Sequence, residues 1–315
     1  MHRLIEPAIL NHQNLMKAWH NGEFVDWEQT NIPLLSHSFS RGSALFEVVD
    51  LLHTSKGPAV FGLREHVDRL YNSAKLSMMD LPLSPDDLVK HVIETVRENN
   101  VKRGSIKFYA YYAGIELKVT PADPTVSITI FVVDFDKEGV EQSELSKPVN
   151  VMTSTFRKLH PETIPTAAKV TGAYLNPFLA KMDAIKNGYD DVVLLDTMGY
   201  VSEGSTSNLF LIYGEEVVTP SLRSVLPGIT RKAMIETFES INVNVCERDV
   251  LPEELEDCNE AFFTSSIAKV QPIRSIDKRI LCEACPGRKT QQLVDQTVDL
   301  FDANLESMMG WLTFV

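Results

Sequence analysis

The sequence predicts an α/β protein with two domains. Apolar strand-like runs alternate with amphipathic helix-like segments over most of its 315 residues. This length allows one large domain or two medium ones. A charged stretch poor in apolar residues, "DKEGVEQSELSKP", interrupts the alternation near the middle of the chain. We therefore predict a domain over residues 1–134, a linker over 135–147 and a second domain over 148–315.

Turn signals, periodicity and capping residues define the expected elements of the first half. The turn signal Asn21-Gly22 is followed by a predicted hairpin arm over residues 23–35. Residues 59–82 begin as a strand and continue as a helix, and Ser84 caps a helix that begins at Pro85. Three apolar runs are predicted to be strands: residues 45–54, 105–114 and 125–135.

The second half is expected to begin with a strand over residues 149–158. Three short strands are predicted within 190–220, a further strand over 243–250, and a strand followed by a loop over 260–277. Amphipathic runs predict helices, which lie over residues 175–189, 228–242, 251–259 and 288–305.

Charge and cysteine content exclude some classes of function. The net charge of −13 argues against a nucleic-acid partner and against an anionic membrane surface, because both need a basic face. No apolar run reaches the length of a membrane span. Cys282 and Cys285 form a C-x-x-C pair without a second metal-binding pair, so we predict structural thiols and no metal site.

Lys169 lies in "IPTAAKVTGAYLN", residues 164–176, among small, apolar and helix-breaking neighbours. Loss of hydration in such a setting disfavours the ammonium form and lowers the pKa of a lysine. The neutral amine is a nucleophile for carbonyl groups. The alternative is a lysine whose stem packs on apolar surface near a strand end while its ammonium reaches water.

Glu203 lies in "GYVSEGSTSNLF", in a turn between two apolar strands. One interpretation is a carboxylate that holds a ring nitrogen protonated. The alternative is an ordinary acidic residue that caps or solvates the turn.

Two segments predict anion sites. In "LPGITRKAM", Ile229 and Thr230 stand in the first turn of a predicted helix, whose free N–H groups attract anions. In "TSSIAK", residues 264–269, Ser266 is one of the hydroxyl residues that precede a possible second helix start. A plain helix N-terminus is the alternative for the first segment.

Arg64 also has two interpretations. It precedes Asp68 by one helical turn, which favours an ion pair within the helix. The guanidinium fork also suits a phosphate.

Taken together, these residues match one cofactor. Pyridoxal 5′-phosphate (PLP) has an aldehyde, a pyridine nitrogen and a phosphate. A lysine, an acid, two anion sites and an arginine are the groups needed to hold it.

With these motifs the chain resembles the class IV, or fold-type IV, aminotransferases, and among them the branched-chain aminotransferases most. That family also holds D-amino acid aminotransferases and aminodeoxychorismate lyases. The resemblance is strongest in "IPTAAKVTGAYL", "GYDDVVLLDTMGYVSEGSTSNLFLI" and "LPGITR". It implies a smaller N-terminal α/β domain and a larger C-terminal domain, with PLP in the cleft between them.

The resemblance also implies a role for each site residue. Lys169 matches the Schiff-base lysine, which also moves the proton between Cα and the cofactor. Tyr174 matches the tyrosine near the phenolic oxygen of the cofactor, and Glu203 matches the acid that pairs with the pyridine nitrogen. The residues that match the phosphate cup are Arg64, Ile229, Thr230 and Ser266.

The chain departs from the family pattern on the substrate side. Branched-chain enzymes usually carry a tyrosine where Arg41 stands, and a Tyr-x-Arg where this chain has "SIKF". The arginine-rich loop typical of D-amino acid enzymes is not apparent in "GIELKVTPADPT". We expect Arg41 or Lys107 to meet a substrate carboxylate. Tyr109 belongs to an aromatic run that either forms an apolar substrate wall or packs in the core.

The activity implied is transamination from a branched-chain or other hydrophobic L-amino acid to a 2-oxo acid such as 2-oxoglutarate. The alternatives are a D-amino acid aminotransferase, an aminodeoxychorismate lyase, and a protein that binds PLP without turnover. The resemblance further implies a homodimer, and the absence of a signal-like start predicts a cytoplasmic location.

Overall fold

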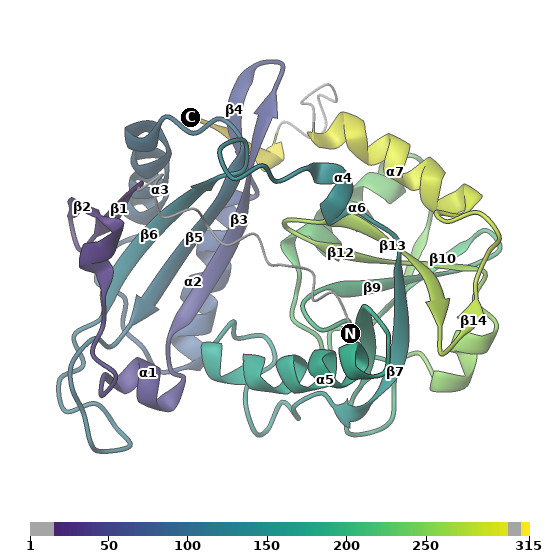
Figure 1. The fold of residues 1–315 in the computed structure, drawn as a ribbon, viewed down its shortest axis with the longest axis horizontal. Coiled ribbons are helices and arrows are strands. Elements are labelled where there is room, and N and C mark those ends of the chain that lie inside the picture. Colours follow the sequence, from purple (N-terminus) through teal and green to yellow (C-terminus); the bar gives the residue numbers. More distant parts are fainter. Residues whose placement is uncertain (1–15, 302–309) are drawn as a thin grey trace.

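The computed structural model describes residues 16–301 and 310–315. Its strands form two sheets, seven-stranded in one half and eight-stranded in the other, and helices accompany both (Figure 1). This arrangement confirms the predicted α/β fold class, with one sheet in each half. The predicted linker, residues 135–147, connects strand β6 (Ser127–Asp134) of the first sheet with strand β7 (Val149–Arg157) of the second. It contains the short helix α4 (Gln142–Leu145).

The first sheet is antiparallel throughout, in the order β15-β4-β3-β5-β6-β1-β2. Its strands are β1 (Lys17–His20), β2 (Glu23–Asp26), β3 (Leu45–Thr54), β4 (Gly57–Phe61), β5 (Gly104–Tyr111), β6 (Ser127–Asp134) and β15 (Leu312–Phe314). Its helices are η1 (Trp27–Thr30), α1 (His37–Arg41), α2 (Leu63–Leu76) and α3 (Pro85–Asn99).

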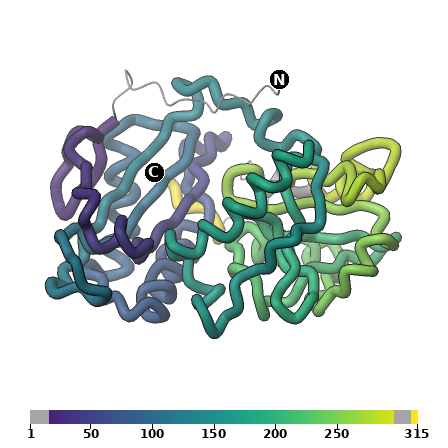
Figure 2. The backbone as a smooth tube through the Cα atoms, turned by 60° about the horizontal axis from the view of Figure 1, so that its bottom comes forward, coloured from purple at the N-terminus to yellow at the C-terminus, as the bar shows by residue number. Residues whose placement is uncertain are grey.

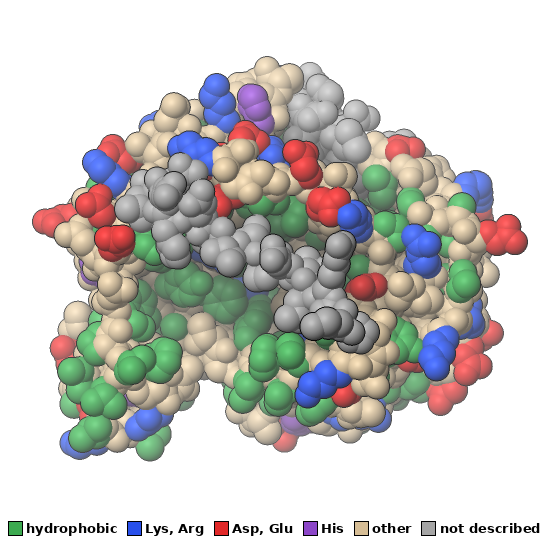
Figure 3. Space-filling view, in the orientation of Figure 1, with side chains coloured by type: hydrophobic (Ala, Val, Ile, Leu, Met, Phe, Trp, Pro, Cys, Tyr) green, Lys and Arg blue, Asp and Glu red, His purple; other side chains and the backbone are tan. Residues whose placement is uncertain are grey.

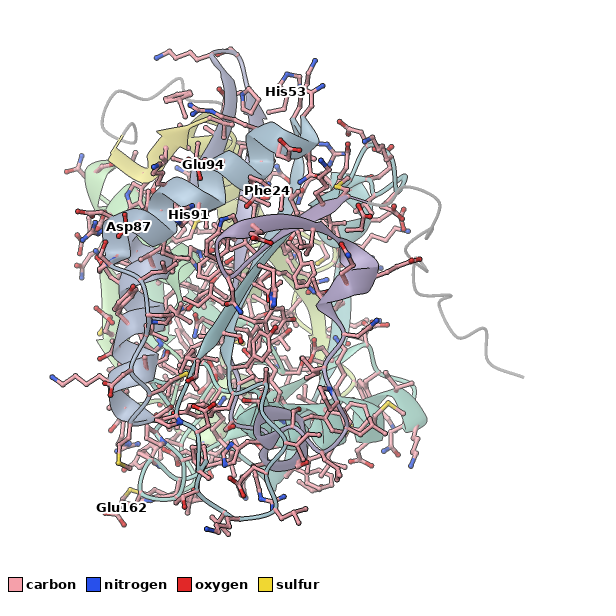
Figure 4. The ribbon with its side chains drawn as sticks, turned by 90° about the vertical axis from the view of Figure 1, so that its left-hand side faces the viewer. Phe24, His53, Asp87, His91, Glu94 and Glu162 are labelled. Carbon is pink, nitrogen blue, oxygen red and sulfur yellow. The ribbon has the colours of Figure 1, made fainter. Side chains whose placement is uncertain are left out.

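Helices α2 and α3 bury one face of this sheet. Alternate residues of β3, among them Leu45 and Val49, pack with Val67 and Leu70 of α2 and with Val92 of α3. Another side of α3 carries charged and polar groups, and Figure 4 shows Asp87, His91 and Glu94 along it. The residues between the buried positions of β3 therefore face the other half of the molecule.

The second sheet is mixed, in the order β11-β10-β9-β12-β13-β7-β8. Its strands are β7 (Val149–Arg157), β8 (Asp191–Leu195), β9 (Asn208–Tyr213), β10 (Glu216–Pro220), β11 (Val245–Arg248), β12 (Glu260–Ser265) and β13 (Lys269–Ile276), and β14 (Arg279–Ile280) pairs with β13. Its helices are η2 (Thr171–Tyr174), α5 (Leu175–Lys186), α6 (Ile229–Ser240), η3 (Pro252–Glu256) and α7 (Arg288–Phe301).

A shared apolar cluster joins the two halves. Phe61 of β4 packs with Phe210 and Phe262 of the second sheet, and Ile229 and Trp311 belong to the same cluster. The C-terminal strand β15 also belongs to the first sheet, where it pairs with β4 (Figures 1 and 2). Assigning all of residues 148–315 to the second domain therefore overlooked this strand.

Three segments differ from the sequence predictions. The arm predicted over 23–35 ends at Asp26, because Asp26 and Gln29 form a capping box that starts η1. The loop predicted within 260–277 is instead a short turn between β12 and β13. The helix predicted over 288–305 is described to Phe301, and its last residues lie outside the described part.

Within the described ranges, no helix is long and apolar enough to span a membrane. The same ranges hold no cluster of three or more potential metal-ligand side chains. All four cysteines are free thiols. Burial, and to a lesser extent the neighbouring Cys282, raise the pKa of Cys285 to about 11.

Candidate active site

A cavity of about 330 Å³ lies between the two sheets. Its walls come from the side of β3 that faces the second half, from α2, from the start of α6 and from the turn between β12 and β13. The residues that line it are Phe46, Val48, Arg69, Lys169, Tyr174, Thr206, Asn208, Leu226, Gly228, Ile229, Thr230, Thr264, Ser265, Ser266 and Ile267. Six of the seven residues expected to hold the cofactor are in or beside this cavity, and Arg64 is not.

Lys169 reaches the cavity with its amine. The Nζ atom donates a hydrogen bond to the Tyr174 hydroxyl at 2.6 Å and lies 4.8 Å from the centroid of the Phe46 ring. Loss of hydration, and next the positive charge of Arg69, lower the pKa of Lys169 from 10.5 to about 8. The structure thus favours the interpretation of Lys169 as a nucleophilic amine over that of a solvated lysine.

The small residues around Lys169 let its segment pass against the first sheet. The Lys169 carbonyl accepts a hydrogen bond from the Phe46 amide at 3.2 Å. Gly172 lies so close to Gly42 that a Cβ on Gly172 would be 2.9 Å from the Gly42 carbonyl oxygen. A larger residue at position 172 would push the lysine away from the cavity.

Glu203 is buried in a smaller cavity of about 60 Å³, next to the larger one. The two cavities share the lining residues Tyr174, Thr206, Asn208 and Leu226. The Glu203 carboxylate forms an ion pair with Lys158 and accepts hydrogen bonds from Asn208 Nδ2 at 3.0 Å and the Leu226 amide at 3.2 Å. These partners orient the carboxylate and replace the water that an exposed turn acid would have.

One end of the larger cavity is suited to an anion. Ile229 and Thr230 begin α6, whose free N–H groups and dipole favour negative charge. Ser266 lines the same end. The hydroxyl of Thr264 is buried there without a hydrogen-bond partner among the described residues, which a bound oxyanion would supply.

The structure places Arg69, rather than Arg64, at this cavity. Arg64 is on the outer side of α2, where its half-exposed side chain pairs with Asp68 at 3.0 Å and also with Asp86. The ion-pair interpretation of Arg64 is therefore the one the structure supports. The spacing of His66, Arg69 and Ser73 puts them on one buried side of α2, and this polar stripe was the signal for Arg69 that the sequence analysis missed.

Arg69 is held by a buried network. Its Nε and Nη2 atoms donate to the two oxygens of Glu47 at 2.8 and 2.6 Å, and its Nη1 donates to the Pro227 carbonyl at 3.0 Å. Burial raises the pKa of Glu47, but Arg69 and His66 outweigh it and hold that pKa at about 2. A fixed guanidinium with hydrogens to spare remains for an anion.

The residues expected to bind substrate are in different places. Tyr109 stacks on Phe46 with ring centroids 5.9 Å apart and lines a side cavity of about 150 Å³. Lys107 is exposed and pairs in register with Val48, which lines the main cavity. Arg41 instead donates to the Leu117 carbonyl at 3.1 Å, so it is turned toward a loop.

Comparisons with known proteins give a consistent result. The model of the family "Amino-transferase class IV" matches residues 44–276. A branched-chain-amino-acid aminotransferase of Pseudomonas aeruginosa is 32% identical over 297 residues, which is 94% of this chain and 96% of that protein.

Solved structures are similar over almost the whole chain. The branched-chain aminotransferase of Thermoproteus uzoniensis with norvaline has a TM-score of 0.89 at 32% identity and covers 95% of this chain and 99% of its own. The T.th. branched-chain amino acid aminotransferase complexed with N-(5′-phosphopyridoxyl)-L-glutamate has a TM-score of 0.88 at 30% identity, with coverages of 95% and 98%.

Proposed function

Because the chain belongs to the class IV aminotransferases, which use PLP, we propose that the cavity between the sheets holds this cofactor on Lys169. The observation that carries the proposal is the Lys169 amine, with a pKa of about 8, in a cavity that has one end suited to an anion. The unpartnered Thr264 hydroxyl at that end fits a phosphate group.

Each residue has a task in this proposal. When bound, PLP supplies a carbonyl for the amino group and a ring that takes up electrons. Lys169 holds the cofactor and, as a neutral amine, moves a proton to and from the substrate Cα. Tyr174 fixes the Lys169 amine through their hydrogen bond. Glu203, oriented by Asn208 and the Leu226 amide, provides negative charge for the ring nitrogen.

The phosphate cup that we propose differs from the sequence prediction in one residue. Arg69 replaces Arg64, and the start of α6 with Ile229 and Thr230 supplies N–H donors. Ser266 adds a hydroxyl from the turn opposite. Glu47 keeps Arg69 in place, so little side-chain entropy is lost on binding.

We propose a hydrophobic L-amino acid as donor and 2-oxoglutarate as acceptor. The first sheet offers an aromatic wall, in which Phe46 stacks on Tyr109 and Tyr109 meets Phe131 edge to face. Norvaline and an L-glutamate derivative occupy two of the similar structures. Arg41 is turned to a loop, so Lys107 is the better placed of the two candidates for a carboxylate, with its role still a prediction.

The test compares amine donors by the absorbance of the bound cofactor. L-leucine, L-valine, D-alanine, D-glutamate and a primary amine without a carboxylate are added separately, with Lys169→Ala as the variant that should not turn over. We expect L-leucine and L-valine to convert the spectrum and 2-oxoglutarate to restore it. Preference for the D-amino acids reverses the donor assignment, pyruvate release from aminodeoxychorismate indicates a lyase, and no conversion by any donor indicates binding without turnover.

We also propose a homodimer, in line with an exposed apolar surface. Large hydrophobic side chains gather on the lower face of both halves, over α5 and over α1 with its neighbouring loop (Figure 3). On α5, Leu175, Phe178, Leu179, Met182 and Ile185 form an apolar stripe that is 39–62% exposed. Exposed apolar surface of this kind marks an interface, and we propose that a second copy related by two-fold symmetry covers both groups.

Light scattering on purified protein tests the dimer. Phe178→Glu should give a monomer, whereas Met198→Glu, which changes a 66% exposed methionine elsewhere, should leave the dimer intact. A wild-type protein that is monomeric at all concentrations would contradict the proposal. The cytoplasmic location remains a prediction from the sequence.

A further inference from the structure

A buried ion pair connects the two sheets at the edge of the cavity. Asp50 follows Phe46 and Val48 on the same side of β3, and both of those residues line the cavity. Its carboxylate Oδ2 is 2.9 Å from the Nζ of Lys269, the first residue of β13. Asp50 is only 3% exposed and the Lys269 side chain 16%. Two charges removed from water in this way need a close partner, and each is the other's partner.

The backbone of Lys269 is in an unfavourable conformation. Its φ angle is +59°, in the left-handed region where a side chain costs free energy and glycine does not. Ser265 and Lys269 close the hairpin between β12 and β13 around three residues, 266–268. A left-handed residue after such a three-residue turn is usually glycine. A lysine at this position points to a use for its side chain.

The turn that Lys269 closes belongs to the anion end of the cavity. Ser265, Ser266 and Ile267 line it. Helix α4, in the segment between the sheets, contacts the same turn: Gln142 donates to the Ile267 carbonyl at 3.5 Å and accepts from Lys269 Nζ at 3.4 Å. The turn is thus held from the first sheet and from the connecting segment at once.

We propose that Asp50 and Lys269 are positioning residues, which hold residues 265–268 against the anion bound in the cavity. Neither residue lines the cavity. The ion pair sets the distance between β3 and the turn, and so brings the Ser266 hydroxyl and the turn amides to face Arg69 and the start of α6. The anion is the cofactor phosphate or the substrate carboxylate. This inference rests on the proposed cofactor site.

The decisive variant is Asp50→Asn/Lys269→Gly. It removes both charges, so neither is left buried alone, and glycine relieves the left-handed backbone. We therefore expect a melting temperature close to that of the wild type. We expect the affinity of the cofactor-free protein for PLP to fall at least tenfold, and its affinity for pyridoxal, which lacks the phosphate, to change less than twofold. Lys17→Met, which breaks a 2.9 Å ion pair with Glu98 away from the turn, is the control and should leave both affinities unchanged.

A second arm separates the two anions. If the substrate carboxylate is the group held, the double variant keeps its PLP affinity. Its KM for the amino acid donor then rises at least tenfold, whereas its KM for an amine that lacks the carboxylate does not change. Either loss supports the positioning role. Equal losses for PLP and pyridoxal together with a lower melting temperature would show general loosening and overturn it, as would wild-type values throughout.

Hydrogen exchange gives a readout that does not depend on the cofactor. Amides of residues 266–268 should exchange faster in the double variant than in the wild type, while those of β9 and β12 stay unchanged. If the wild-type protein does not bind PLP, the proposed function fails, but this exchange experiment still tests the tie between Asp50 and the turn. Unchanged exchange in the turn would contradict the tie itself.

Discussion

Replacing Lys169 by methionine should stabilise the cofactor-free protein at neutral pH. Methionine has a similar length and no charge, so it fills the same space without the cost of an ammonium group among apolar neighbours. The Lys169 amine lies 4.8 and 5.1 Å from the ring centroids of Phe46 and Tyr174, and Arg69 adds positive charge nearby. A residue that weakens the fold in this way is expected where the function needs it.

The magnitude follows from the pKa of Lys169. The value falls from 10.5 to about 8, and each pKa unit corresponds to about 1.4 kcal/mol, so the charged form costs the folded state at most about 3.5 kcal/mol. The variant also loses the hydrogen bond to Tyr174, a loss of about 1 kcal/mol. The net gain in the free energy of unfolding at pH 7 is therefore about 2 kcal/mol.

The difference in stability between the wild type and Lys169→Met should depend on pH. Between about pH 8 and 10.5 the unfolded chain keeps the Lys169 proton that the folded protein has lost, so the unfolded state binds more protons. Wild-type stability therefore rises relative to the variant over this window, and the advantage of Lys169→Met disappears by about pH 10.5.

Urea unfolding of the cofactor-free protein at pH 7 and pH 10 measures the effect. Lys17→Met is the control, because the side chains of Lys17 and its ion-pair partner Glu98 are 53% and 39% exposed, so the loss of this pairing should make little difference. An equal change at both pH values, or no gain at pH 7, would refute the reasoning about the Lys169 amine.

Three further predictions concern the cofactor site and the first half. Arg69→Lys should weaken PLP binding about ten- to a hundredfold, because a hydrogen bond to a charged group contributes roughly 1.5–3 kcal/mol; Arg64→Ala should leave it unchanged, and equal losses in a spectroscopic titration would return the phosphate role to Arg64. Glu203→Gln should keep PLP bound but slow the half-reaction with an amino acid on the order of a hundredfold, which corresponds to a rise of a few kcal/mol in its activation free energy. Stopped-flow absorbance measures this rate, and an unchanged rate would make Glu203 an ordinary turn acid. Ser84→Ala should lower the free energy of unfolding by about 1 kcal/mol without changing PLP affinity, since Ser84 only caps α3, and a weaker affinity would contradict that local role.

Local patterns were sufficient to predict most helices and strands. The strand over 45–54 and the Ser84 cap agree with the structure to the residue, because periodicity and capping depend on near neighbours. The C-terminal strand Leu312–Phe314 was missed. It is short, and its pairing with β4 depends on a contact across most of the chain.

The sequence identified those residues of the candidate site that lie within continuous motifs. Lys169, Tyr174 and Glu203 are such residues, and the structure brings them close together. Arg69 was not identified from the sequence, because its position at the cavity depends on which side of α2 meets the second half. Helical spacing alone shows both arginines beside the apolar face and does not show what each side meets.

The central claim is that Lys169 carries the cofactor. Borohydride reduction of the PLP-loaded protein, followed by peptide mapping, tests it most directly. We predict one pyridoxyl group, on the peptide that contains Lys169, and none on the peptide that contains Lys158, the other lysine beside the Glu203 cavity. A label on Lys158 or on any other lysine, or no label at all, would contradict the account.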